Sequence, residues 1–298
     1  MTLRGLDASA MQGGVLPFAL FPADYRFVIL KCAQGNDGID PSFARNVKLA
    51  TAKGLVVFAY CFVYPLPHLD PLVQAKTFVD AVRAGGVNGP IFLDCEWPAP
   101  QRLHPQEKGW AEWGCSATQI ATWLEAHCAE VARLSGCQPV LYTYPDWWTN
   151  LARGADVSWA VEYDLWIASY VTKGWPRDTD APTVPRPWRT WRFWQFDGNG
   201  GLRLPNGVDA DFCIFNGSES ELQAFAQGEP ISAPPVNVNT VVGLQAALAD
   251  AGFFNGALDG VRGPQTVAAI MAFQLARGLV SDGIVGPDTR AALTASES

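Results

Sequence analysis

Two carboxyl groups close an otherwise apolar stretch, Ile91-Phe-Leu-Asp94-Cys95-Glu96. The stretch reads as a β-strand, and because strand side chains alternate, Asp94 and Glu96 point to the same face. Two residue rises place their Cα atoms about 6.6 Å apart. Neighbouring like charges raise one pKa, which leaves one group protonated and the other ionised. Cleavage of a glycosidic bond needs this combination: a proton donor for the leaving oxygen and an anion facing the oxocarbenium ion.

Other acids lie in the first and last expected strands. Asp7 stands in the first apolar run, and Asp209 and Asp211 share one face of the last. The residues alone do not choose between the two late acids, since either could accept from backbone amides in a loop. A capping or salt-bridge pair is the structural alternative for Asp94 and Glu96, and the end of an apolar strand favours function. A second hypothesis makes Asp7, Asp94, Glu96 and Asp211 oxygen ligands of a hard cation in a metal-dependent hydrolase.

Aromatic residues are abundant, with 12 Trp, 16 Phe and 7 Tyr. Sugar rings present apolar C–H faces that pack on aromatic planes, and several aromatic residues at strand ends share one face of their strands. Any one of them could instead fill the protein interior. As a set they predict a carbohydrate groove whose substrate contacts are Tyr60, Phe62, Tyr142, Trp166, Tyr170 and the amide of Gln195.

The elements that must hold these residues alternate between strands and helices. Several strand candidates are continuous apolar runs, which is typical of strands covered on both faces. Eight strands with helices between them predict an α/β fold, a TIM-like β/α barrel. The helices become short after the fifth strand, so we expect an irregular barrel. The strand candidates are Leu3–Asp7, Phe27–Ala33, Val56–Val63, Ile91–Glu96, Pro139–Tyr144, Leu165–Tyr170, Thr190–Asp197 and Val208–Phe215.

Three helices between these strands have readable ends. Asp40 is expected to cap a helix that Pro41 opens and Gly54 closes. Asp70-Pro71 opens a second helix that ends near Gly85. A third has a capping box of Ser116 and Gln119 and runs to Gly136.

A proline-rich segment divides the chain into a predicted catalytic barrel (1–227), a linker (228–239) and a tail (240–298). The tail contains an internal repeat: the stretch from Asp259 to Ile270 recurs from Asp282 to Leu293, 23 residues later. Each copy is a Gly-Pro turn followed by a helix. The tail is therefore predicted to be a small all-α helical module, too small for a catalytic cleft and suited to binding.

Composition excludes several classes of protein. The net charge of −8 argues against a nucleic-acid binder. The longest apolar run, Leu55–Tyr64, has ten residues, so we expect no membrane insertion. Seven scattered cysteines without a Cys-x-x-Cys pair predict neither disulfides nor a zinc site, and His-Glu-x-x-His is absent. We expect a monomer that needs no metal and no cofactor.

Several stretches, in order along the chain, form a pattern known from one family. They are Gly5-Leu-Asp7-Ala-Ser with Gln12-Gly13, Phe27-Val-Ile-Leu-Lys31, Ala59-Tyr60-Cys-Phe62, Phe92-Leu-Asp94-Cys-Glu96, Leu165-Trp-Ile-Ala-Ser-Tyr170, Phe193-Trp-Gln195-Phe and Asp211-Phe-Cys-Ile-Phe215-Asn-Gly. Through them residues 3–227 resemble glycoside hydrolase family 25, the barrel lysozymes (N-acetylmuramidases) common in phage endolysins and bacterial autolysins. The tail resembles small helical peptidoglycan-binding domains through Leu244-Gln245, Asp259-Gly260, Phe273-Gln274 and Asp282-Gly-Ile-Val-Gly-Pro.

The resemblance implies cleavage of the β-1,4 bond from N-acetylmuramic acid to N-acetylglucosamine, with peptidoglycan as the partner. Glu96 would be the general acid, and Asp94 would steady the anionic side of the reaction through the substrate's acetamido group. Asp7 and a late-strand acid would line the same mouth. The family's spacing back from Phe215-Asn-Gly selects Asp211 over Asp209.

The chain departs from the family pattern at two places. Cys61 stands where the family often has His, and Gln34 stands where it has an acid, which affects substrate contacts more than the chemistry. A third hypothesis is a non-catalytic wall-binding protein, which the intact acids disfavour. The N-terminus has no stretch of signal-peptide length. We therefore expect a phage endolysin, made in the host cytoplasm, that reaches the bacterial cell wall through a holin pore.

Overall fold

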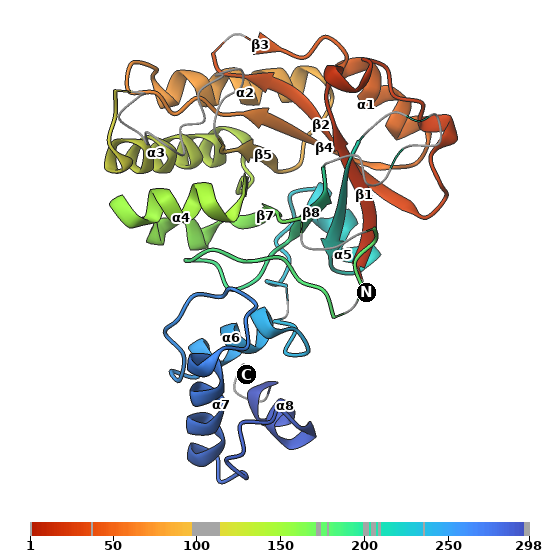
Figure 1. Cartoon of the computed structure of the whole chain (residues 1–298). Helices are drawn as coiled ribbons and strands as arrows, with labels where there is room; N and C mark the ends of the chain where they lie inside the picture. Colours follow the sequence, from red (N-terminus) through yellow and green to blue (C-terminus); the bar gives the residue numbers. More distant parts are fainter. Residues whose placement is uncertain are drawn as a thin grey trace.

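The computed structural model describes most of the 298-residue chain (Figure 1). The described residues are 2–36, 38–96, 114–170, 174–177, 179–198, 203, 207, 210–234 and 236–294.

Eight strands close into a barrel, and a ninth short strand extends one side of it. The strand order is β1-β9-β8-β7-β6-β5-β4-β2-β3, and an additional pairing of β1 with β2 closes the ring. All neighbours around the ring are parallel except at β9, which runs antiparallel to both β8 and β1. The strands are β1 (Thr2–Ala8), β2 (Tyr25–Gln34), β3 (Gly38–Ile39), β4 (Val56–Phe62), β5 (Ile91–Asp94), β6 (Val140–Thr143), β7 (Asp164–Ala168), β8 (Phe193–Asp197) and β9 (Asp211–Asn216).

The sequence therefore predicted every strand of the barrel, and the α/β barrel class is confirmed. Two features were not anticipated. The short β3 pairs with the end of β2, and the last barrel strand is reversed. The expected start of that last strand, Val208 and Asp209, lies outside the described residues.

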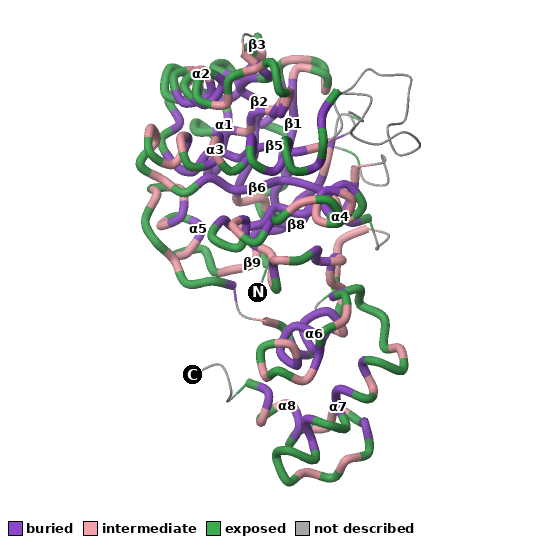
Figure 2. The backbone as a smooth tube through the Cα atoms, turned by 90° about the vertical axis from the view of Figure 1, so that its left-hand side faces the viewer, coloured by how far each residue is buried: buried purple, intermediate pink, exposed green. Residues whose placement is uncertain are grey.

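Helices cover the outside of the barrel in its first half. They are α1 (Phe43–Ala52), α2 (Pro71–Ala84), α3 (Ala117–Ser135), α4 (Pro145–Gly154) and α5 (Glu219–Ala226), with 3₁₀ turns at Ala10–Gln12, Phe18–Leu20 and Ser158–Glu162. No α-helix connects β7 to β8 or β8 to β9 within the described residues, as expected for an irregular barrel. Figure 2 shows the buried backbone concentrated along the strands and the exposed backbone on the outer helices.

Two of the three predicted helix starts are correct. Asp70 caps α2, where its carboxylate accepts from Leu72 N, and the capping box of Ser116 and Gln119 opens α3. The start at Asp40 and Pro41 is wrong, because α1 begins at Phe43. The Asp40 carboxylate instead accepts from the backbone N–H and hydroxyl of Ser42, at 2.8 and 2.6 Å, in a turn that precedes the helix.

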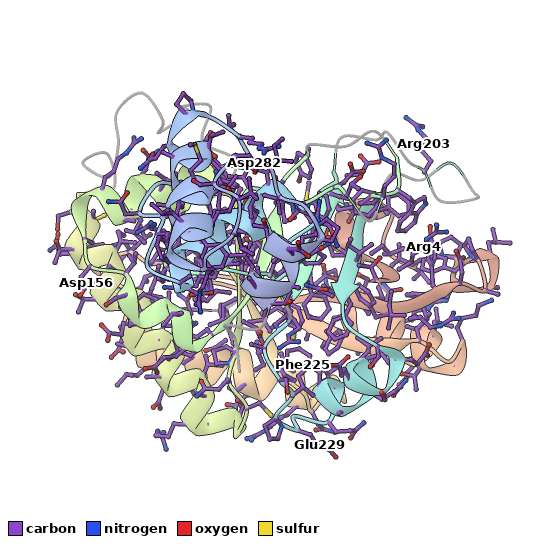
Figure 3. All side chains as sticks on the ribbon, turned by 90° about the horizontal axis from the view of Figure 1, so that it is seen from below. Arg4, Asp156, Arg203, Phe225, Glu229 and Asp282 are labelled. Carbon is purple, nitrogen blue, oxygen red and sulfur yellow. The ribbon has the colours of Figure 1, made fainter. Side chains whose placement is uncertain are left out.

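The barrel is filled by aromatic rings and closed at its base. Phe193 lies at the centre of this packing, with ring centroids 5.0–5.5 Å from Phe27, Phe58, Phe92 and Phe215. From below, the α5 residue Phe225 contacts three of these rings (Figure 3). Since the base is plugged by side chains, a ligand can enter only at the opposite end, where the parallel strands finish.

The tail consists of α6 (Val241–Asp250), α7 (Pro264–Ala276) and α8 (Pro287–Thr294). Its sequence repeat is also a structural repeat. The Gln245 amide donates to Asp259 Oδ1 at 2.7 Å and accepts from Gly260 N at 3.0 Å. In the second copy the Gln274 amide donates to Asp282 Oδ1 at 3.0 Å and accepts from Gly283 N at 2.9 Å. Each repeat is therefore built around one buried glutamine that binds an Asp-Gly turn.

The segment between barrel and tail is less exposed than its composition indicates. The Arg192 guanidinium donates to Ser232 O at 2.8 Å, and Val238 is buried. The tail contacts the barrel through Arg186, which donates to Gly256 O at 2.7 Å, and through an ion pair of Arg189 with Asp250. Figure 1 places the tail beside the N-terminus, at the base of the barrel.

Candidate active site

Four carboxyl groups gather at the open end of the barrel. Asp94 is the last residue of β5, and Glu96 follows it by two positions. Asp7 stands near the end of β1, directly opposite Asp211 in the β1–β9 register. Because β9 is antiparallel, its first residue lies at the same end as the last residues of the parallel strands. Asp7 and Asp94 are buried at 4% and 6% exposure, and the other two acids are half-buried.

The environment of these acids favours their protonated forms. Burial raises the pKa of Glu96 to about 7, with a further contribution from the negative charge of Asp211 and an opposing one from Lys31. Burial also raises the pKa of Asp94 well above its usual range, and the neighbouring charge of Glu96 adds to it. At neutral pH a substantial fraction of Glu96 therefore carries a proton.

One oxygen of the Asp94 carboxyl group lacks a partner. Asp94 Oδ1 is buried, and no described residue forms a hydrogen bond with it. Buried acceptors in folded proteins normally have a hydrogen-bond donor. An acceptor without one at the open end of the barrel can therefore receive a donor from a ligand.

Lys31 is a functional candidate that sequence reasoning used only as a motif residue. Its ammonium group donates to Gln34 Oε1 at 2.9 Å and lies 5.3 Å from the ring centroid of Phe62. Its positive charge lowers the pKa of both Asp94 and Glu96. The signal was available, because Lys31 is the only charged residue between Phe27 and Ala33.

The predicted aromatic contacts divide between the mouth and the barrel core. Tyr170 is 47% exposed, and Tyr60 and Phe62 are half-buried. Trp166 is 1% exposed and packs against Tyr142 at a centroid distance of 4.3 Å. Because neither face of the Trp166 ring is exposed, the structure gives no support for direct contact between Trp166 and a sugar.

Gln195 and two residues not singled out from sequence complete the mouth. The amide of Gln195 binds Asp7, Tyr142 and Tyr170. The Cys213 thiol donates to Asp7 Oδ2 at 3.2 Å. Gly198 is required by close approach, since a Cβ there would lie 2.5 Å from the Tyr170 hydroxyl and 3.2 Å from Asp211 Oδ1.

Comparison with known proteins adds the decisive observation: residues 6–203 match the family described as glycosyl hydrolases family 25. The chain belongs to this family. Residues 237–293 match the peptidoglycan binding domain family. Both resemblances stated from sequence are thereby confirmed.

Individual relatives agree with this family-25 assignment. The uncharacterized protein YegX of Escherichia coli O157:H7 is 31% identical over 204 residues, which cover 68% of this chain and 64% of that protein. Lysozyme M1 of Streptomyces globisporus is 29% identical over 231 residues, 75% of this chain and 71% of that protein. A bacterial lysozyme structure from Streptomyces coelicolor superposes with a TM-score of 0.63 at 27% identity, covering 76% of this chain and 98% of that one. The chain thus spans about 64% of the length of the Escherichia coli relatives.

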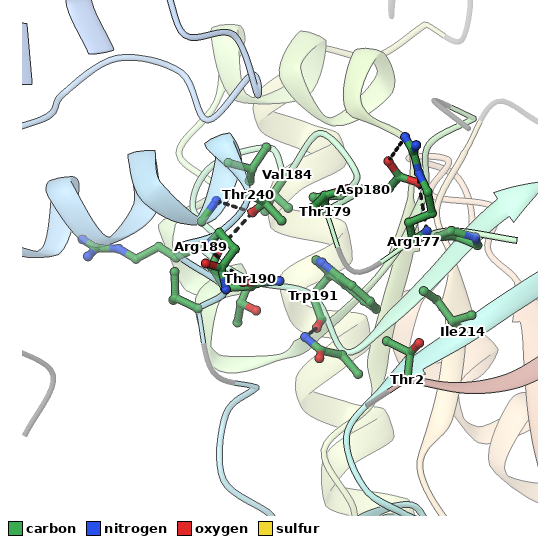
Figure 4. Close-up of a pocket in the computed structure, with 18 of the residues that line it drawn as sticks. Thr2, Arg177, Thr179, Asp180, Val184, Arg189, Thr190, Trp191, Ile214 and Thr240 are labelled. Atoms are coloured by element: carbon green, nitrogen blue, oxygen red, sulfur yellow. Dashed lines mark hydrogen bonds and ion pairs between the residues drawn. The ribbon is translucent and has the colours of Figure 1, made fainter. Parts of the chain in front are cut away.

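One cavity in the described part of this family-25 chain lies away from the acids. It has a volume of about 810 Å³ and lies between the base of the barrel and the tail, lined by residues such as Trp191 and Arg290 (Figure 4). Its charged groups are already engaged: Arg177 pairs with Asp180 at 3.0 Å, and Arg290 donates to Asn239 Oδ1 at 2.7 Å. The cavity is therefore a solvated seam between two parts of the chain.

Three further observations concern metal binding, membrane spans and cysteines. Among the described residues, no group of three or more His, Cys, Asp or Glu side chains is arranged to hold a metal ion. No helix in the described part of the chain combines the length and apolarity needed to cross a bilayer. All seven cysteines are free thiols, as predicted.

Proposed function

We propose that this protein is a muramidase that cleaves the β-1,4 bond between N-acetylmuramic acid and N-acetylglucosamine in bacterial peptidoglycan. The observation that carries the proposal is the pair at the end of β5. Glu96 has a pKa raised to about 7, it follows Asp94 at the end of β5 by two positions, and its charge raises the pKa of Asp94. A proton donor beside a second carboxyl group is what glycosidic cleavage uses.

In this proposal Glu96 protonates the leaving glycosidic oxygen. Its burial keeps the proton in place at neutral pH, where an exposed glutamate would have lost it. Lys31 opposes that effect and so keeps the pKa from rising beyond the useful range. Tyr170, Phe62 and Tyr60 are the proposed faces on which sugar rings pack.

Asp94 is the proposed anion on the other side of the reaction. The charge of Glu96 contributes to the raised pKa of Asp94, and that contribution is absent while Glu96 holds its proton, so Asp94 is the member of the pair that ionises. Its unpartnered Oδ1 would accept the N–H of the substrate's acetamido group and hold that group against the sugar carbon that develops positive charge. The bound ligand would then supply the donor that the described residues do not.

The tail is the proposed anchor to the wall. Support comes from its match to the peptidoglycan binding domain family. A tethered barrel meets its substrate at a raised effective concentration without new catalytic contacts. We propose the bacterial cell wall as the place of action and a monomer as the active form.

The test is mass spectrometry of purified peptidoglycan digested in chelator with the wild type and with Glu96→Gln. We expect new reducing ends on muramic acid from the wild type and at least a 100-fold loss in the variant, in line with the usual contribution of a general acid. Glu125→Gln is the matched control, because Glu125 is exposed on α3 and should keep full activity.

Each other outcome points to a different reading. Released peptides or reducing glucosamine ends would mean that another bond is cut. Loss of wild-type activity in chelator would favour the metal-dependent hydrolase. Wall binding without cleavage would favour a non-catalytic protein, and full activity of Glu96→Gln would remove Glu96 from the mechanism.

A further inference from the structure

The orientation of the Gln195 side chain is fixed by two tyrosines. The hydroxyls of Tyr142 and Tyr170 both donate to Gln195 Oε1, at 3.0 and 2.7 Å. Phenols are donors at neutral pH, and burial raises the pKa of both tyrosines further. A flipped amide would place its NH₂ group against two hydroxyls and its oxygen against a carboxyl group. The amide nitrogen therefore points at Asp7, where it donates to Oδ2 at 2.7 Å.

The same oxygen of Asp7 receives a second donor from β9. Cys213 Sγ lies 3.2 Å from Asp7 Oδ2, and the side chain of Cys213 is fully buried. Burial and the negative charge of Asp7 raise the pKa of the Cys213 thiol well above its usual range, so the thiol keeps its proton and donates. Both donors reach Oδ2, which leaves Oδ1 as the oxygen free to carry a proton.

Asp7 also has a carboxyl neighbour across the strand pair. In the antiparallel β1–β9 register Asp7 lies directly opposite Asp211, and Cys213 lies opposite Gln195 in the β8–β9 register. Side chains directly opposite one another share a face, with Cβ atoms about 5 Å apart. Two carboxyl groups at that spacing do not both ionise readily, and the charge of Asp211 raises the pKa of the more deeply buried Asp7.

We propose that Gln195 and Cys213 are positioning residues that hold Asp7 by Oδ2, so that the proton of the Asp7–Asp211 pair sits on Asp7 Oδ1 and Asp7 serves as a neutral hydrogen-bond donor in the mouth. The inference rests on the proposed muramidase function for the substrate that receives this hydrogen bond. It changes the assignment of Gln195 from a substrate contact to a residue that acts through Asp7.

The surroundings of Asp7 agree with a neutral side chain. Its pKa is raised well above the usual range, first by burial and next by Asp211, while the hydrogen bonds from Gln195 and Cys213 act in the opposite direction. Within the described ranges, the titratable groups that act on this end of the barrel include Lys31 on β2, Tyr60 on β4, Asp94 and Glu96 at the end of β5, Tyr142 on β6, Tyr170 after β7, and Asp211 and Cys213 on β9.

The direct test is a carbon-13 NMR titration of the Asp7 carboxyl group in the full-length protein, assigned with Asp7→Asn. We expect wild-type Asp7 to be protonated at pH 6. Cys213→Ala removes a donor that favours the ionised form, so the Asp7 pKa should rise by about half a unit to one unit. Cys213→Ser supplies a stronger donor of similar size, so the pKa should fall. Cys128→Ala, a fully buried thiol on α3, is the matched control and should leave the titration unchanged.

Activity variants test the tyrosine part of the network. Gln195→Leu should lower kcat about 10- to 100-fold with KM within about threefold of the wild type, because orientation of a reacting group is lost while the groove is kept. Tyr142→Phe and Tyr170→Phe should each lower kcat less than Gln195→Leu does, since one hydroxyl still fixes the amide. The double variant should approach Gln195→Leu.

Three outcomes would overturn the proposal. They are an Asp7 that is ionised at pH 6, a titration that ignores both Cys213 substitutions, and a Gln195→Leu variant that changes KM alone. None of these depends on the bond cleaved. If the wild type produced no muramic acid reducing ends, the muramidase proposal would fail while the Asp7 titration could still be read.

Discussion

Two regions of this molecule surround a carboxyl group in opposite ways: Asp282 of the tail is exposed, and Asp94 of the barrel mouth is buried. In the tail, Asp282 accepts from Ile284 N and from the Gln274 amide, and these donors lower its pKa. At the barrel mouth, Asp94 has an oxygen without a partner and a like charge beside it, and its pKa is raised. The tail thus satisfies its carboxylate, whereas the mouth leaves its carboxyl group unsatisfied.

The difference distinguishes a structural aspartate, Asp282, from one that is available for chemistry, Asp94. A carboxylate with several donors stabilises a turn and has no reason to exchange protons near neutral pH. A buried carboxyl group with few donors is costly to the fold, so its retention indicates work on a ligand. Asp94 is such an acid, and three more carboxyl groups lie at the same end of the barrel.

The largest effect should come from Asp94→Asn. We expect turnover to fall about 100- to 1000-fold, because the anion that faces the developing positive charge is lost. Thermal stability should be kept or raised, since the repulsion with Glu96 disappears. Asp282→Asn should do the reverse, lowering stability of the tail and leaving turnover on short soluble glycans intact. If Asp94→Asn and Asp282→Asn lost the same amount of stability, the two carboxyl groups would not differ in their contribution to the fold.

Gln274→Leu tests the tail side. The substitution leaves the buried N–H of Gly283 without its acceptor and removes a donor from Asp282, at a cost of about 1–3 kcal/mol to the tail. Hydrogen exchange followed by mass spectrometry should show faster exchange across α7 and α8. Gln265→Leu on the exposed side of the same helix is the control. Unchanged exchange in Gln274→Leu would show that the repeat does not depend on its glutamine.

The pH dependence of activity tests the mouth. Because the pKa of Glu96 is raised to about 7, the group is protonated below that pH, and activity should fall about tenfold per unit well above it. Gln34→Glu would place a carboxylate on Lys31 and weaken its effect, so this limb should move to higher pH. The test is to measure kcat/KM of both proteins between pH 4 and pH 9. If the fall in activity at high pH moved to lower pH in Gln34→Glu, Lys31 would not have the assigned role.

The raised pKa of Glu96 should also make the stability of the fold depend on pH. The pKa of Glu96 is about 7 in the folded protein and 4.5 in the unfolded chain. The free energy of unfolding therefore decreases as the pH rises from 4.5 to about 7. Glu96→Gln should therefore raise the melting temperature at pH 8 more than at pH 4. Equal effects at both values would mean that Glu96 is not held in its protonated form.

The smallest effect concerns salt. With a net charge of −8, the protein approaches an anionic cell wall against repulsion, so activity on walls should rise a few-fold with moderate salt. Activity on short neutral glycans should not change. A steep fall on walls would point to attractive contacts that the net charge conceals.

Local pattern was enough to predict most of the fold and the acids. The apolar run marks the strand, and alternation predicts Asp94 and Glu96 on one side. The strand ends at Asp94, two residues earlier than expected, and the charge of Glu96 still raises the pKa of Asp94. The caps at Asp70 and Ser116 follow from side-chain chemistry within one turn. The start at Asp40 failed because a short acidic side chain can satisfy a turn before a helix as well as the helix itself.

Contacts between distant strands could not be predicted in this way. Gln195 has its role because Tyr142, Tyr170 and Asp7 reach it from three other places in the chain. Cys213 reads as a small buried hydrophobic residue until the reversal of β9 brings it against Asp7. Neither the reversal nor that partner is encoded in a short window of sequence.

Under the proposed function, the attachment of the tail to the base of the barrel sets the distance between the bond that is cleaved and the point at which the tail binds. The mouth opens at the far end of strands such as β1, whose seven residues span about 23 Å. A molecule anchored by its tail would therefore reach a bond at some distance from its anchor. It could cleave several neighbouring glycan strands in turn without cleaving the glycan to which its tail is bound.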